Sequence, residues 1–274
     1  MGGSGDRGEG RPVCRLPGCS AFGAAACENT RMDHDGPDIE ELFAPIEPAA
    51  AFGVILNEAH QVLSHISQPV DAELWGSDMI GALASSAAEM PGVMAALTTS
   101  LVPAAEETAT PEALALLRIF GAIGSAELRA AATEAADRLT ALGVPDQDWA
   151  ATIGSPVAGR CWHYGDVGGR QESVTMTFAY GDNGHAVSVL IDHGHGGRIK
   201  DAWVGDAAGL LDKTWLAAET DPLIVFDTMD AAEARDRLER AISAGENPDK
   251  PDQVDDLRGH RALLHARVRL LVTG

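Results

Sequence analysis

The sequence predicts an α+β fold in which a helical N-terminal half, built of αα-hairpins, precedes a small antiparallel β-meander of three to four strands flanked by helices. Apolar residues recur at spacings of three and four before Gly143, and they alternate with polar residues between positions 171 and 192. Helical segments return after position 206. We therefore expect a helical domain over residues 37–145 and an α+β domain over residues 155–274.

Residues 1–36 are expected to be a disordered tail, because residues 1–31 are rich in glycine and show no periodicity. Met32 offers an alternative translation start, which would make the preceding residues foreign to the protein. A zinc knuckle built from Cys14, Cys19, Cys27 and His34 fits in ligand type, but its spacing lacks the close pairs of structural zinc sites. A lipoprotein signal ending in "AAAC" is disfavoured because its apolar stretch is short and interrupted.

Three predicted helix starts and one apolar stripe support the prediction that the N-terminal half is helical. Pro37 opens a helix in "PDIEELFAPI", Thr110 caps a second before Pro111, and Ser125 caps a third that ends at Gly143. The last two predict an αα-hairpin whose second helix turns Leu128, Ala132, Ala135, Ala136 and Leu139 inward. Between residues 49 and 66 an apolar stripe predicts one more helix, through Phe52, Ile55, Leu56, Ala59, Leu63 and Ile66.

The helical spacing of apolar residues stops at residues 144–156, which predicts a linker there. The residues that follow show the pattern of strands. Segments 159–166, 172–180 and 185–192 are expected to pair in sequence order, with "GDNG" as a hairpin turn. A further strand is expected in "RIKDAWV", and "PLIVF" is a candidate for another. Asp230 begins a helix that Gly245 closes, and a last helix is expected from about Val254 to Val272.

Composition limits the classes of function. The formal net charge of −21 repels nucleic-acid phosphates and anionic lipids, so neither nucleic acid nor a membrane is an expected partner. No apolar run approaches the roughly 18 residues that a spanning helix needs. Three of the four cysteines fall within the first thirty residues, which does not suit a disulfide framework and favours a cytoplasmic protein.

Known catalytic motifs are absent from the sequence. It contains no G-x-x-x-x-G-K-[ST] phosphate loop, no G-x-S-x-G nucleophile elbow and no H-E-x-x-H zinc helix. A restriction-type nuclease would need an acid two residues before Lys200, and that position is Arg198.

Potential metal ligands collect in the β region. Cys161 and His163 alternate along one strand and so share a face, while His193 and His195 show the same spacing after the main hairpin. Together with Asp192 they form a ligand set that suits zinc. The site requires strand pairing that brings residues 161–163 beside 193–195, which the sequence does not guarantee.

The loop that contains these histidines has two further interpretations. Gly194, Gly196 and Gly197 could turn backbone N–H groups toward an anion, with Arg198 and Lys200 as ligand-binding cations. A strand follows this loop, however, whereas phosphate loops usually lead into a helix. The third interpretation is a wide glycine turn with solvated histidines.

The last helix carries four arginines and no acid between Leu257 and Gly274. An apolar stripe runs along it through Leu257, Leu264, Val268 and Leu271. Such a helix can bind a partner or a membrane surface. We favour packing on the acidic body of its own chain, because the charges are complementary.

These observations support two functional hypotheses. The first is a non-catalytic cytoplasmic protein of regulatory or protein-binding type, with residues 192–200 as the surface that binds another protein. The second is a zinc-dependent hydrolase whose site is built from Cys161, His163, Asp192, His193 and His195. They differ in whether these five side chains converge.

Overall fold

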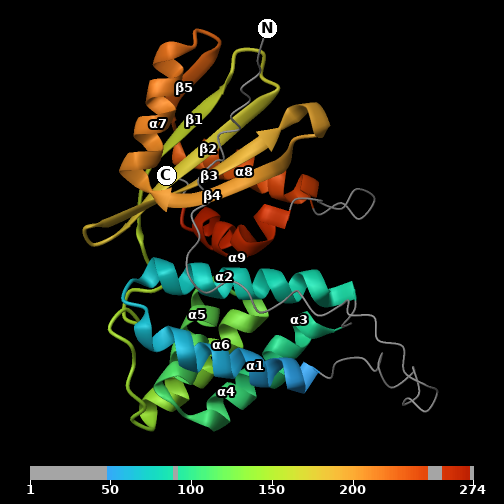
Figure 1. Ribbon diagram of the computed structural model, residues 1–274, viewed down its shortest axis with the longest axis vertical. Coiled ribbons are helices and arrows are strands. Elements are labelled where there is room, and N and C mark those ends of the chain that lie inside the picture. The colour runs from blue at the N-terminus through green and yellow to red at the C-terminus, as the bar shows by residue number, and fades with distance from the viewer. Residues whose placement is uncertain (1–47, 89–91, 246–254, 272–274) are drawn as a thin grey trace, which may run out of the picture. The chain divides into compact units, whose positions relative to one another are not determined.

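A computed structural model of the protein describes residues 48–88, 92–245 and 255–271, and it shows the α+β fold that the sequence predicts (Figure 1). These residues belong to a unit that begins at Pro45. The predicted tail 1–36, its cysteine and histidine set and the helix expected at residues 37–46 lie outside the described residues.

Six helices make up the described part of the helical half. They are α1 (Pro48–Val62), α2 (Pro69–Ser85), α3 (Val93–Ala96), α4 (Val102–Thr108), α5 (Pro111–Ile123) and α6 (Ala126–Ala141). The apolar stripe of α1 is confirmed, since Phe52, Ile55 and Ala59 are buried. Leu63 continues the stripe into a single 3₁₀ turn, Leu63–His65, because α1 itself ends at Val62.

The hairpin of α5 and α6 has the caps that the sequence predicts. Thr110 Oγ1 accepts a hydrogen bond from the Ala113 amide at 3.2 Å, and Ser125 Oγ accepts one from the Leu128 amide at 3.3 Å. Each cap satisfies an amide that has no partner within its helix. The five predicted inner residues of α6 are all buried, and they are Leu128, Ala132, Ala135, Ala136 and Leu139.

The expected linker, residues 144–156, is packed onto the helical core. Trp149 within it is 3% exposed, and its indole Nε1 donates to the Ile66 carbonyl at 3.1 Å. The segment therefore fixes the start of the sheet against the helices.

Five antiparallel strands form the sheet in the order β4-β3-β2-β1-β5. Their bounds are β1 (Val157–Asp166), β2 (Gln171–Tyr180), β3 (Asn183–Asp192), β4 (Arg198–Asp206) and β5 (Ile224–Met229). The fifth strand, which contains part of "PLIVF", exceeds the predicted three to four. Helix α7 (Ala207–Thr220) carries the chain from β4 to the opposite edge, where β5 pairs with β1 and Met229 lies opposite Cys161.

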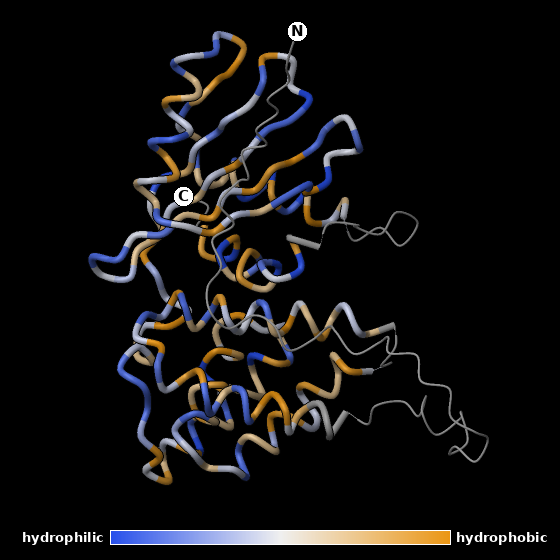
Figure 2. The backbone as a smooth tube through the Cα atoms, in the orientation of Figure 1, coloured by the Kyte–Doolittle hydropathy of each residue, from blue (hydrophilic) through white to orange (hydrophobic). Residues whose placement is uncertain are grey.

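Two helices, α8 (Ala231–Gly245) and α9 (Asp255–Arg269), pack against one face of the sheet. Asp230 begins α8 as expected, because its carboxylate accepts from the Ala232 amide at 2.8 Å. Helix α9 belongs to two hydrophobic cores at once: Leu263 packs among the N-terminal helices, and Leu264 packs on the sheet. Figure 2 shows the hydrophobic stretches of these helices and of the central strands.

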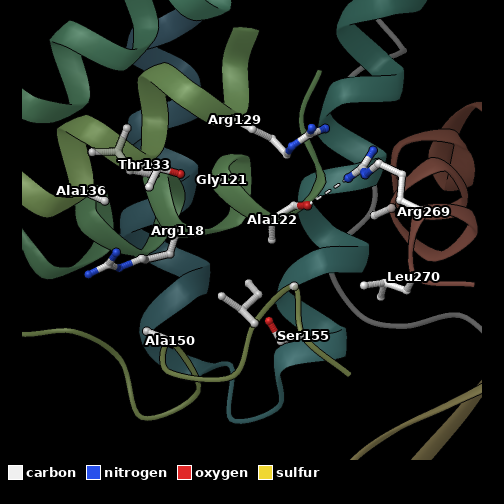
Figure 3. Close-up of a pocket in the computed structure, with 14 residues that line it drawn as sticks. Arg118, Gly121, Ala122, Arg129, Thr133, Ala136, Ala150, Ser155, Arg269 and Leu270 are labelled. Carbon is white, nitrogen blue, oxygen red and sulfur yellow. Dashed lines mark hydrogen bonds between the residues drawn. The ribbon is translucent and has the colours of Figure 1, made fainter. Parts of the chain in front are cut away.

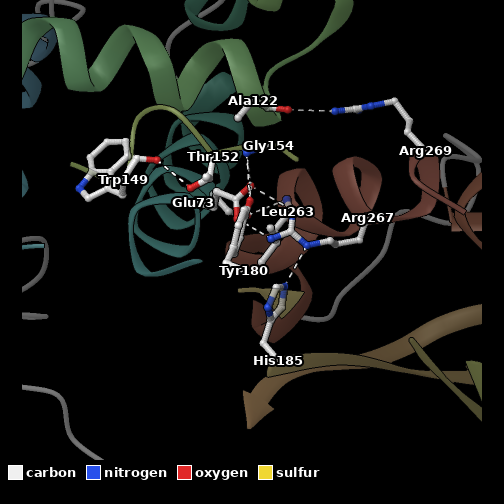
Figure 4. A network of polar contacts seen from close by, with 11 residues as sticks. Glu73, Ala122, Trp149, Thr152, Gly154, Tyr180, His185, Leu263, Arg267 and Arg269 are labelled. Atoms are coloured by element: carbon white, nitrogen blue, oxygen red, sulfur yellow. Dashed lines mark hydrogen bonds and ion pairs between the residues drawn. The ribbon is translucent and has the colours of Figure 1, made fainter. Parts of the chain in front are cut away.

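A buried polar network crosses between α2, α9 and the sheet (Figure 4). Arg267 donates from Nη1 to Glu73 Oε1 at 3.0 Å and also from Nη2 to Glu73, and both side chains are fully buried. Tyr180 donates its hydroxyl to Glu73 at 2.9 Å. One of the four arginines of α9 thus meets a carboxylate of its own chain.

His185 completes this network in its neutral form. Arg267 Nε donates to His185 Nε2 at 3.1 Å, so the ring proton lies on Nδ1, which has no hydrogen-bond partner among the described residues. Burial, and after it the charge of Arg267, lowers the pKa of His185 to about 4.

Candidate functional site at the end of the sheet

A carboxylate with three partners lies at one end of the sheet. Glu172 of β2 is opposite Gly165 of β1 and Ile191 of β3. His163 Nε2 lies 3.1 Å from Glu172 Oε2, and His193 Nε2 lies 2.9 Å from Glu172 Oε1. Arg237 of α8 forms an ion pair with the same carboxylate. Strand pairing therefore brings His163 and His193 together, with Glu172 between them.

Cys161, although it shares a face with His163, is part of the hydrophobic core. It is 2% exposed, and burial, followed by the charge of Asp230, raises the pKa of its thiol to about 11. A thiol with this pKa is protonated near neutral pH, whereas nucleophiles and metal ligands are thiolates.

Asp192 and His195 form a separate pair on the opposite face of the sheet. His195 Nδ1 is 3.0 Å from Asp192 Oδ2, and the side chain of Gln171 donates from Nε2 to the same oxygen at 3.2 Å. The hydrogen bond with His195 and, more weakly, the one from Gln171 hold the pKa of Asp192 below its usual value against the opposing effect of burial.

The five predicted metal ligands therefore occupy three different settings. Across residues 48–88, 92–245 and 255–271, no group of three or more histidine, cysteine, aspartate or glutamate side chains has an arrangement that could hold a metal ion. Zinc binding by Cys161, His163, Asp192, His193 and His195 stays a prediction without support from this placement.

The glycines of loop 192–200 allow the chain to turn back from β3 to β4. Gly196 and Gly197 have φ values of 89° and 73°, a left-handed conformation that glycine adopts without strain. The Gly197 amide donates to the Asp192 carbonyl at 2.9 Å, and the Gly196 amide donates to the His193 carbonyl at 3.4 Å. Both of these N–H groups have an acceptor within the loop, and an anion cradle built from Gly194, Gly196 and Gly197 stays a prediction.

Arg198 and Lys200, the two cations of loop 192–200, belong to the first residues of the edge strand β4. Arg198 donates from Nε to the His195 carbonyl at 3.3 Å. Lys200 is exposed, at the point where the register between β3 and β4 shifts. A bulge of this kind turns side chains of an edge strand outward.

Exposed aromatic and aliphatic side chains continue from β4 into α7. Trp203 of β4 is 41% exposed, and α7 contains no buried residue. Trp215 and Leu216 of α7 are 54% and 61% exposed. Trp215 makes an edge contact with Phe226 of β5, with ring centroids 6.0 Å apart.

Sequence reasoning missed Glu172, Arg237 and the apolar surface of α7. A signal for Glu172 was present, since it shares the two-residue period of Val174, Met176 and Phe178 and so is an acid on the apolar face of a strand. Such a residue is buried beside its partners.

No model of a known protein family, no curated protein and no solved structure matches the chain. No helix within the described residues has the length and apolar character needed to cross a membrane.

Proposed function

We propose that this is a non-catalytic cytoplasmic protein of regulatory type that binds another protein. The contact surface is the β4–α7 surface, which has two parts: loop 192–200 with Arg198, Lys200 and Trp203 on the edge strand β4, and the exposed apolar residues Trp215, Leu216 and Leu223 beside the opposite edge strand β5. The partner is a protein that presents acidic groups beside apolar side chains.

The observation that carries this proposal is the exposure of α7. A helix on a folded body normally buries an apolar stripe, whereas α7 buries no residue and exposes Trp215 and Leu216 by more than half. Tryptophan is among the residues that contribute most to binding energy in protein interfaces. The inward side of α7 is half-buried on the sheet, at Leu210 and Leu211 among others, and a partner would cover the outward side that carries Trp215 and Leu216.

Charge supports an acidic partner. The chain has a formal net charge of −21, whereas β4 carries the two cations Arg198 and Lys200 as well as the exposed Trp203. A partner's carboxylates would be attracted to this edge and repelled by the acidic surface elsewhere, which favours one docking orientation.

The cluster around Glu172 supports a binding role over a catalytic one. Its carboxylate is shared among His163, His193 and Arg237, so it joins β1, the loop after β3 and α8 at one end of the sheet, which is a structural role. The nearest thiol, Cys161, is in the core and protonated.

Affinity capture with matched variants tests the proposal. Immobilised wild-type protein is compared with Arg198→Ala/Lys200→Ala, with Trp215→Ser and with Leu142→Ser, in which a leucine 78% exposed at the end of α6 is replaced. We expect a specific partner to be lost from the first two variants, to be retained by Leu142→Ser, and to elute as salt rises, because exposed charges are screened beyond about 8 Å at physiological ionic strength. If no captured protein distinguishes these variants, the proposal is wrong.

A further inference from the structure

A cavity of about 380 Å³ lies between the α5–α6 hairpin, residues 150–155 and the end of α9 (Figure 3). Its lining combines the apolar residues Leu117, Ala122, Ile153 and Leu270 with the polar residues Arg129, Arg269, Thr133 and Ser155. The volume is that of a site for a small molecule.

Arg129 and Arg269 reach the cavity from α6 and α9. Arg129 Nη1 donates to the Gly124 carbonyl at 3.0 Å, and Arg269 Nη2 donates to the Ala122 carbonyl at 3.2 Å. Both carbonyls are at the C-terminal end of α5, where a helix has unpaired acceptors and partial negative charge. Capping this end uses one of the five N–H donors of each guanidinium.

Neither of these two arginines forms an ion pair with a carboxylate among the described residues. Arg118, which also lines the cavity, shows the contrast: it donates to both carboxylate oxygens of Asp146 at 3.1 and 3.0 Å and to Asp137 at 3.3 Å. In a chain with 41 acidic and 20 basic residues, two arginines without an acidic partner at one cavity are unexpected.

The two charges affect one another. Burial, and after it the charge of Arg129, holds the pKa of Arg269 below its usual value. The half charge of a helix end offsets only a part of two full positive charges. An anion between the guanidinium groups would remove this repulsion and form charge-assisted hydrogen bonds with the remaining N–H groups.

We propose that this cavity binds a small organic anion, a carboxylate or a phosphate monoester with a short carbon body, through Arg129 and Arg269. The planar guanidinium fork suits both kinds of oxyanion. Thr133 and Ser155 offer hydroxyl donors, and the apolar wall accepts the carbon body of the ligand. This site is separate from the β4–α7 surface and does not depend on the protein-binding proposal.

The test measures the melting temperature and the binding isotherm of the full chain with hexanoate, with inorganic phosphate and with uncharged hexanol, all at one ionic strength set with sodium chloride. We expect hexanoate or phosphate to bind and to raise the melting temperature, while hexanol does neither. The hexanoate and phosphate arms show which oxyanion the site prefers.

Three arginine variants separate this site from general charge effects. Arg129→Gln and Arg269→Gln should each weaken anion binding at least tenfold. Arg240→Gln, which removes an exposed arginine of α8 paired with Asp236, should leave binding unchanged. Should either pocket variant fail to fold, Ala150→Leu narrows the cavity while keeping both arginines, and it should weaken hexanoate binding too. The proposal is overturned if neither anion binds the wild type, or if binding is equal in the wild type and in every folded pocket variant.

Discussion

The molecule contains two sets of glutamate, arginine and histidine with nearly the same chemistry in different surroundings. The inner set joins Glu73, Arg267 and His185, and its ion pair is 0% exposed on both sides. The outer set joins Glu172, Arg237 and two histidines, and there the glutamate is 9% and the arginine 28% exposed. The comparison shows that surroundings, more than residue type, determine what such a set contributes.

The physical reason is the medium around the charges. In the inner set, water cannot replace a lost partner, so each group depends on the others and the loss of one leaves a buried charge uncompensated. In the outer set, solvent and dissolved ions reach the partners of Glu172 and weaken each interaction. The inner set should therefore dominate stability, and the outer set should respond to salt.

The largest effect is expected for Arg267→Met. This change leaves Glu73 buried without its cation, and we expect the free energy of unfolding to fall by about 3–5 kcal/mol. Urea denaturation measures it. Adding Glu73→Leu should restore much of the loss, because two apolar side chains need no counterion. A loss below about 1 kcal/mol in Arg267→Met would show that the two sets do not differ.

The second effect is a pH dependence from His185. Its pKa in the folded chain is about 4, below the ordinary value of 6.5, so between these pH values the unfolded chain binds more protons than the folded chain. Stability is therefore complete above pH 6.5 and declines as pH falls toward 4, by about 2 kcal/mol between pH 6.5 and 5. His185→Gln, whose side-chain carbonyl can still accept from Arg267, should flatten this part of the pH profile. An unchanged profile in the variant would assign the dependence to other groups.

A smaller effect is expected in the outer set for Glu172→Gln. Arg237 retains its ion pair with Glu233, and His163 and His193 are partly hydrated, so the loss should be about 1 kcal/mol. Urea denaturation at low and high salt measures it, and the difference from the wild type should shrink at high salt. A salt-independent loss as large as that of Arg267→Met would mean that Glu172 is in a dry site.

The smallest effect is expected when zinc is added to the protein and its melting temperature is measured. We expect equal metal content and an equal melting response to zinc in the wild type and in His193→Ala/His195→Ala, because these histidines already pair with Glu172 and Asp192. Metal analysis and melting curves across pH measure both quantities. Zinc stabilisation that weakens as pH falls and is absent from the double variant would instead support the predicted zinc site.

The fold could be predicted where the signal is local. Thr110 and Ser125 each cap a helix through an amide three residues away, so sequence spacing alone locates the helix starts. The alternation in β2 and β3 similarly fixed which residues face α8 and α9. The fifth strand has a weaker signal in the sequence, because β5 pairs with β1 across about 60 residues and its short apolar run has no periodicity.

The polar sets could not be predicted because their members are distant in the sequence. Glu73 and Arg267 are 194 positions apart, and Glu172 and Arg237 are 65 apart. What the sequence does show is part of the inner set: Arg267 lies within the apolar stripe of α9 between Leu264 and Val268, and His185 lies on the apolar face of β3 with Val187. A charged residue in such a position indicates a buried partner without identifying it.

The position of α9 near the C-terminal end of the sequence affects how the protein folds during its synthesis on the ribosome. Its side chains complete both the helical core and the sheet core, and Arg267 is the counterion of Glu73. At about 5–20 residues per second, the 194 residues that separate this pair take roughly 10–40 s to synthesise. For that interval the emerged helices hold a carboxylate without its cation and lack the apolar contacts of Leu263, so this surface stays open to solvent until α9 has been synthesised.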